Sequence, residues 1–197
     1  MRIVPGEKTQ ISSDAGFFLD KQAPGEAVFT IGEFWSWAFS DLQDNTLRGE
    51  FAEFIVARAL GINLHIRQAW TNYDLETDDG LRIEVKASAY LQSWDQKKLS
   101  RLEFAGLKAR AWNPIDGYEK EKTYRADVYV FCVQTAKTHQ EYDQFDLSQW
   151  EFRVVSRKEL ERLGVESLSY GTLCRICSEK VLFEELREAI YGIINTN

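Results

Sequence analysis

The segment NYDLETDDGLRIEVK, residues 72–86, decides how the rest of the chain is interpreted. Apolar and polar residues alternate on both sides of Asp-Asp-Gly, which is typical of two β-strands joined as a hairpin. A two-residue loop would mix polar and apolar side chains on both faces. A three-residue loop, residues 78–80, separates them and puts the glycine in the left-handed position. We therefore predict the register in which Leu75 lies opposite Ile83.

This register gathers Asp74, Glu84 and Lys86 on the polar face of the hairpin. Two carboxylates directly opposite each other repel unless a cation lies between them or one of them takes up a proton. Two carboxylates completed by water and substrate phosphate are a ligand set that Mg²⁺ accepts. Lys86 would then orient a water molecule or stabilise developing negative charge. The alternative is a solvated strand face on which Glu84 and Lys86 only pair with their neighbours.

A helix is expected before the hairpin, in LRGEFAEFIVARALG, residues 47–61. Its apolar residues recur at helical spacing, any of the three residues at 44–46 can cap its N-terminus, and Gly61 ends it. The remaining elements follow from shorter patterns: strands over 64–70, 73–77, 81–88, 126–134 and 150–156, and helices over 31–42, within 95–112, and around 157–163 and 179–190. This order predicts an α/β fold with a mixed sheet.

Length and composition favour one domain. The chain has 197 residues, of which 44% are apolar and 28% charged, and it contains only three prolines and no linker-like stretch. We divide the single domain, 1–197, into an N-terminal arm with an aromatic helix docked on the core (1–45), a central core (46–134) and a C-terminal strand with helices (135–197). Residues 1–28 are polar and rich in turn formers, so we expect an irregular arm there.

The three cysteines, the lack of a signal-peptide pattern and the lack of an apolar run long enough to cross a membrane suggest a cytoplasmic location without a membrane partner. The net charge of −7 argues against a uniformly basic surface that coats nucleic acid. Charge is uneven, however, because residues 82–125 carry ten Lys or Arg against six Asp or Glu. This distribution of charge is consistent both with a local binding site for a polyanion and with an ordinary solvated surface.

Asp74 followed by Glu84-Val85-Lys86 resembles the D-x(n)-ExK signature of the PD-(D/E)XK nuclease superfamily, which has the restriction-endonuclease-like fold. GEFAE, residues 49–53, is similar to the G-x-x-x-E of the first helix in archaeal Holliday-junction resolvases and related nucleases. Glu53 is the matching glutamate, Glu50 is a second choice, and Gly49 would leave room beside the strand. The proline that the family often has before the aspartate is Tyr73 here.

The resemblance covers residues 46–134 and implies a core ordered helix-strand-strand-strand-helix-strand around a mixed sheet. It also implies hydrolysis of phosphodiester bonds with Mg²⁺, for which Mn²⁺ can substitute. The implied metal ligands are Asp74, Glu84, the Val85 carbonyl and Glu53, and Lys86 would stand beside the attacking water. Related enzymes often act as dimers, so the resemblance also suggests a homodimer.

The segment AYLQSWDQKKLSRLEF, residues 89–104, follows the signature. Some relatives of the superfamily place a glutamine here near the active site, and Gln92 or Gln96 would be that residue. Phosphate contacts are assigned to the cations of the segment, which are Lys97, Lys98 and Arg101. Trp94 is assigned to the core rather than to base stacking.

These observations predict a metal-dependent DNA nuclease that acts in restriction, repair or defence. The first alternative is an inactive nucleic-acid-binding or interaction module on the same fold. A second alternative is a redox or zinc protein centred on Cys174 and Cys177, whose spacing supplies half of a zinc site. No second cysteine pair or paired histidine motif completes it, so two reduced cysteines are the preferred interpretation.

Overall fold

The computed structural model describes residues 11, 17–18, 29–62, 65–68, 71–113, 115 and 117–195. Its centre is a four-stranded sheet in the order β3-β4-β8-β9. The strands are β3 (Leu75–Glu76), β4 (Arg82–Ala89), β8 (Val128–Gln134) and β9 (Trp150–Ser156). β4 and β8 are parallel, whereas the two outer pairings are antiparallel. The predicted α/β class with a mixed sheet is therefore confirmed.

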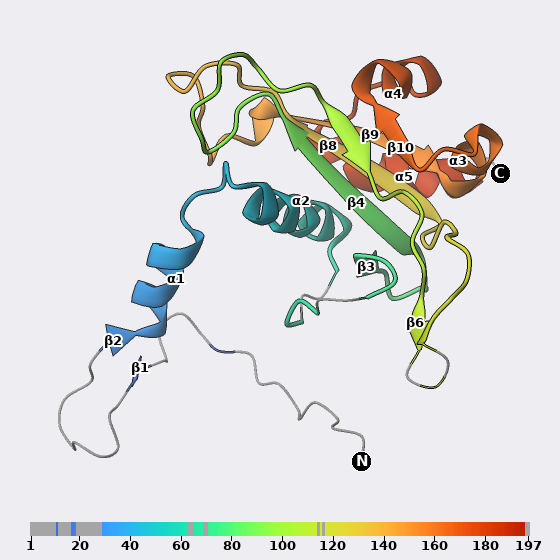
Figure 1. Ribbon diagram of the computed structural model, residues 1–197, viewed down its shortest axis with the longest axis horizontal. Helices are drawn as coiled ribbons and strands as arrows, with labels where there is room; N and C mark the ends of the chain where they lie inside the picture. Colours follow the sequence, from blue (N-terminus) through green and yellow to red (C-terminus); the bar gives the residue numbers. More distant parts are fainter. Residues whose placement is uncertain are drawn as a thin grey trace.

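Helices cover both faces of the sheet (Figure 1). α2 (Asn45–Leu60) and α5 (Leu186–Asn195) pack on one face, where they share a core with alternate residues of β4, β8 and β9. The other face packs against α3 (Arg157–Leu163), α4 (Tyr170–Ile176), β5 (Glu103–Ala105) and β10 (Ser167–Ser169). Every residue of β8 is buried, as expected for a strand that is covered on both faces.

The helix expected over 47–61 is confirmed as α2, with the predicted ends. Asp44 caps its N-terminus by accepting hydrogen bonds from the amides of Thr46 and Leu47. Gly61 ends it with φ of 70°, a left-handed conformation that glycine adopts without strain. Successive turns of α2 bury Ala52, Ile55 and Val56 against the sheet, whereas Phe54 on the same helix is 50% exposed.

The hairpin has the predicted register. Leu75 pairs with Ile83, and Glu76 with Arg82. The amide of Thr77 donates to the carbonyl of Leu81 over 3.0 Å and closes the three-residue turn, in which Gly80 has φ of 83°. The odd-numbered residues of β4 therefore face the core that α2 covers, and Glu84 and Lys86 face the opposite side.

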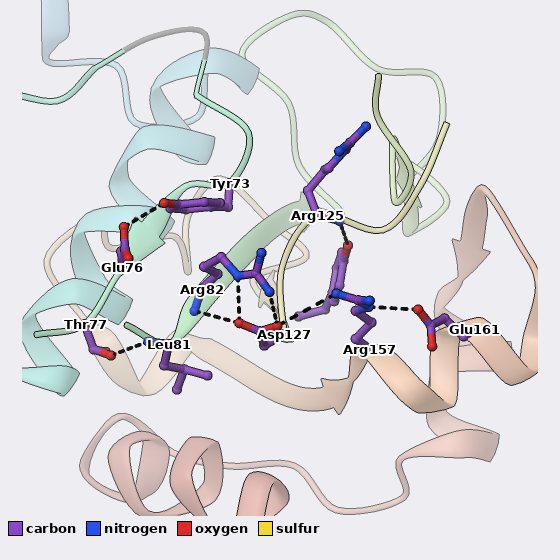
Figure 2. Close-up of polar contacts among 10 residues, drawn as sticks. Tyr73, Glu76, Thr77, Leu81, Arg82, Arg125, Asp127, Arg157 and Glu161 are labelled. Carbon is purple, nitrogen blue, oxygen red and sulfur yellow. Dashed lines mark hydrogen bonds and ion pairs between the residues drawn. The ribbon is translucent and has the colours of Figure 1, made fainter. Parts of the chain in front are cut away.

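The parallel strands β4 and β8 are joined at their N-terminal ends by Asp127, as Figure 2 shows. Its carboxylate accepts hydrogen bonds from the guanidinium of Arg82 over 2.9 and 2.6 Å. Its amide donates to the Arg82 carbonyl, and its own carbonyl accepts from the amide of Arg157 at the start of α3. One residue thus ties together two strands and a helix.

The prediction of a helix within 95–112 is wrong. Residues 90–102 are irregular, and β5 (Glu103–Ala105) follows them. Leu102 and Phe104 are buried while Glu103 between them is exposed, so the local period is two rather than that of a helix. Further along lie the short strands β6 (Trp112–Asn113) and β7 (Gly117–Tyr118). The described part of the connection between β4 and β8 therefore contains no helix.

Other boundaries also differ from the expectations. Residues 65–68 are not a strand, and residues 64, 69 and 70 of the strand expected there lie outside the described residues. The last helix begins only at Leu186, after a 3-10 turn (Phe183–Glu185), and α4 was not predicted. The strand expected over 73–77 is reduced to the two residues of β3.

The aromatic helix is confirmed as α1 (Ile31–Phe39), but its expected docking on the core is not, because Trp37 is 85% exposed. The arm expected over 1–28 lies outside the described residues, apart from residue 11 and β1 (Phe17–Phe18), which pairs with β2 (Phe29–Thr30). Among the described residues, no helix has the length and apolar character needed to cross a membrane.

Two glycine substitutions test the hairpin turn. Gly80→Ala is expected to lower the free energy of unfolding by about 1 kcal/mol, because alanine resists a positive φ. Gly49→Ala, inside α2, is expected to raise it by about 0.5 kcal/mol, because alanine loses less backbone entropy in a helix. A Cβ at either position meets no atom within 4 Å, so crowding affects neither variant. Urea unfolding measures both values, and equal effects would contradict the turn.

Candidate functional site

Asp74 lies directly before β3 and is held against β4. Its amide donates to the carbonyl of Ile83 over 3.1 Å, and its Oδ2 accepts a hydrogen bond of 2.7 Å from the amide of Val85. Asp74 thus lies beside the strand that carries Glu84, and the charge of Glu84 acts on it. The sequence therefore brings two carboxylates together through backbone geometry alone, and the side chain of Asp74 also completes the hydrogen bonding of β4.

Glu84 and Lys86 form an ion pair on the same face of β4. The distance from Lys86 Nζ to Glu84 Oε1 is 2.6 Å, and the two side chains are only 23% and 15% exposed, respectively. Lys86 also lies close to Gly106, which follows β5, since a Cβ added to that glycine would be 4.0 Å from Nζ. The lysine is thus enclosed between its own strand and the segment after β5.

Glu53 reaches the site from α2 and is held by an arginine that the sequence analysis missed. Arg67 binds Glu53 in a bidentate arrangement, with Nε and Nη2 donating over 2.6 and 2.7 Å. Its Nη1 is 3.5 Å from Glu50, the second-choice glutamate. Arg67 belongs to the stretch expected to be a strand, and no local pattern marked it as a partner of α2.

The electrostatics show that these groups act on one another. Burial, followed by the charge of Glu84, raises the pKa of Asp74 to about 7, and the charge of Glu53 adds to this. The Val85 hydrogen bond and the charge of Lys86 lower the same pKa and only partly compensate. Hydrogen bonding to Glu53, together with the charge of Asp74 among others, raises the pKa of Arg67. We call Glu53, Arg67, Asp74, Glu84 and Lys86 the Asp74 cluster.

A cleft of about 1310 Å³ opens beside this cluster. Glu53 and Asp74 line it, together with parts of α2, residues 65–68 and residues 71–76. The opposite wall is formed by Ala109, Arg110, Trp112 and Tyr118, from the connection between β4 and β8. The cleft therefore gives solvent molecules and ligands a route to two of the three carboxylates.

The expected nucleic-acid contacts lie in the loop after β4. Gln92 is buried, and its amide group donates to the Ala89 carbonyl and accepts from Arg48. The amide group of Gln96 donates to the Tyr90 carbonyl and to Ser100 Oγ over 3.1 and 3.0 Å. These bonds hold the loop in shape. Lys97, Lys98 and Arg101 are exposed. Trp94 is 53% exposed rather than part of the core as expected.

The donor set of the cluster fits a hard divalent cation, because Glu53, Asp74 and Glu84 supply only oxygen ligands. Burial, followed by the charges of Glu84 and Glu53, raises the pKa of Asp74, and a bound cation would favour the ionised form of this carboxyl. At present each carboxylate has its own protein partner, and within the described ranges no three Asp, Glu, His or Cys side chains stand close enough to hold a metal ion. Cation binding would thus require the carboxylates to turn from these partners.

The cysteines form no comparable group. Cys132 is buried in β8, and burial raises the pKa of its thiol. Burial also raises the pKa of Cys177, whose Sγ donates to the Glu179 carbonyl over 3.4 Å. All three are free thiols. Raised pKa values disfavour the thiolate that both redox chemistry and zinc binding use.

Comparison with known proteins adds no assignment: the chain matches no protein-family model and no curated protein sequence.

Asp74→Asn tests the electrostatics. Folded Asp74 holds its proton up to about pH 7, whereas the unfolded carboxyl releases it near pH 4, so this residue lowers the free energy of unfolding as the pH rises between those values. Asparagine keeps an acceptor for the Val85 amide but does not titrate. Relative to the wild type, the variant is therefore expected to gain about 2 kcal/mol between pH 5 and pH 7. Urea unfolding in EDTA measures this gain, and a constant difference between the proteins would contradict it.

Proposed function

We propose that this protein is a metal-dependent nuclease of the PD-(D/E)XK type that hydrolyses phosphodiester bonds in DNA. The observation that carries the proposal is the position of Asp74, a partly buried carboxylate with a pKa of about 7, bonded to the strand that presents Glu84 and Lys86. Chance matches to a D-x(n)-ExK pattern need not bring these side chains together. Here the charges of both Glu84 and Lys86 act on Asp74, and Asp74 lines a cleft.

The roles follow from the chemistry of each group. Mg²⁺, when bound, would polarise the phosphate and lower the pKa of a water molecule. Asp74, Glu84, the Val85 carbonyl and Glu53 are the groups assigned to hold it. Lys86, which is enclosed and positively charged, would orient the attacking water and stabilise charge on the phosphate oxygens. Arg67 would release Glu53 when the cation binds and then become free to contact a phosphate.

The topology supports the restriction-endonuclease-like fold in part. α2, the antiparallel pair β3–β4 and the parallel strand β8 follow one another in the implied order, but residues 65–68 do not form the first of the three strands that the resemblance implies. The expected helix before β8 is replaced by an irregular connection with short strands. Because this connection builds one wall of the cleft, the departure affects substrate access more than the carboxylates themselves.

Cleavage of supercoiled plasmid and of single-stranded and branched DNA with Mg²⁺ or Mn²⁺ tests the proposal. Asp74→Asn and Lys86→Ala are each expected to lower the cleavage rate by about 100-fold or more, because the first removes a carboxylate assigned to the metal and the second removes the cation assigned to the attacking water. EDTA is expected to abolish cleavage by the wild type.

The matched control is Lys180→Ala, which removes an exposed lysine and should cut like the wild type. Its neighbour Val181 pairs with β9, at the opposite edge of the sheet from β3. Circular dichroism confirms that each variant is folded. If the wild type is inert on every substrate, or if the two site variants cut as fast as the control, the nuclease proposal fails. An inactive binding module on the same fold then becomes the preferred interpretation.

A further inference from the structure

Two aromatic side chains that line the cleft are exposed to solvent. Trp112 in β6 pairs directly with Tyr118 in β7. Residues directly opposite each other in an antiparallel pair project from the same face, so the two side chains lie side by side. Trp112 is 58% exposed and Tyr118 is 63% exposed. Neither belongs to either hydrophobic core, so packing within the fold does not explain the presence of two large rings here.

The rings face the cleft that leads to the Asp74 cluster. Trp112 and Tyr118 line the same cleft as Glu53 and Asp74. The hairpin that carries them projects from the sheet at the end where β3 lies (Figure 1). Trp94, with a similar exposure of 53%, is not among the residues that line this cleft, so exposure alone does not place an aromatic ring there.

Positive charge accompanies the rings. Arg110, two residues before Trp112, lines the cleft beside the rings. The rest of the lining is mixed in charge, because Arg67 is held there by Glu53, and Glu50, Asp74 and Glu76 also line the cleft. A ring pair with cations within one groove matches what a single-stranded nucleic acid needs, since bases stack on aromatic faces and the backbone is neutralised by arginine. In duplex DNA the faces of the bases are stacked on one another inside the helix, so they cannot stack on Trp112 or Tyr118.

We propose that Trp112 and Tyr118 form a stacking platform for an unpaired base of single-stranded DNA. This inference rests on the proposed nuclease function for its consequence, which is that the enzyme acts on single strands or on single-stranded segments of branched DNA. A base stacked on the hairpin holds its strand in the cleft, and the adjoining phosphate then lies toward Asp74 and Glu53.

The experiment compares binding of a fluorescent oligo(dT) with binding of an abasic oligomer of the same length and backbone charge. Fluorescence anisotropy is measured with the full chain in EDTA, so that no cleavage occurs. The wild type is expected to bind oligo(dT) about tenfold more tightly than the abasic oligomer. Trp112→Ala and Tyr118→Ala should each lose most of this preference, whereas Trp112→Phe should retain part of it.

Trp94→Ala is the matched control, because it removes an equally exposed tryptophan outside the cleft and should keep the full preference. Equal binding of both oligomers by the wild type, no binding of either, or an undiminished preference in Trp112→Ala would each overturn the platform. Plasmid cleavage is read separately. If the protein cleaves DNA but shows no preference for oligo(dT), the stacking platform is wrong and the nuclease proposal stands. If it prefers oligo(dT) but cleaves no DNA, the nuclease proposal is wrong and the stacking platform stands.

Discussion

The amide of Val85 donates its hydrogen to the side chain of Asp74, and this bond can form only in the register that the three-residue turn imposes. A shift of one residue would turn Ile83 and Val85 out of the core beneath α2 and would put Glu84 and Lys86 into it. The cost of moving these two charged side chains into the apolar core disfavours the shift. The register that forms the core thus also assembles the carboxylates, and fold and site cannot vary independently.

The balance of charge in the Asp74 cluster explains why so many ionisable groups coexist there. Arg67 and Lys86 each take one glutamate, and Asp74 is left with a backbone amide and a proton that it retains to near-neutral pH. The cluster is therefore close to neutral with this proton and negative without it. A site of this kind changes its charge within the pH range in which most proteins work, so protons and cations compete for the same oxygens.

The sequence alone was sufficient where local patterns determine structure. The hairpin register follows from alternation and from one glycine, and the ends of α2 follow from Asp44 and Gly61. Asp74, Glu84 and Lys86 could be grouped because pairing in a hairpin is a local matter. Arg67 could not be found, since its bond to Glu53 depends on how a segment without periodicity folds back over α2. The connection over 90–127 was misjudged because its polar residues, such as Gln96, serve the loop backbone rather than a helix face.

The parallel pairing of β4 with β8 has a kinetic consequence. Both outer pairings join strands that are close in sequence, whereas β4 meets β8 only after the whole connection over 90–127 has been closed into a loop. Closing such a loop costs chain entropy before any contact compensates for it, so contacts of this kind slow folding. The hairpin with Asp74 and Glu84 requires no such closure, but the segment that encloses Lys86 and the wall that carries Trp112 belong to the connection itself. The hairpin can therefore form without the cleft, whereas the cleft and the enclosure of Lys86 require the pairing of β4 with β8.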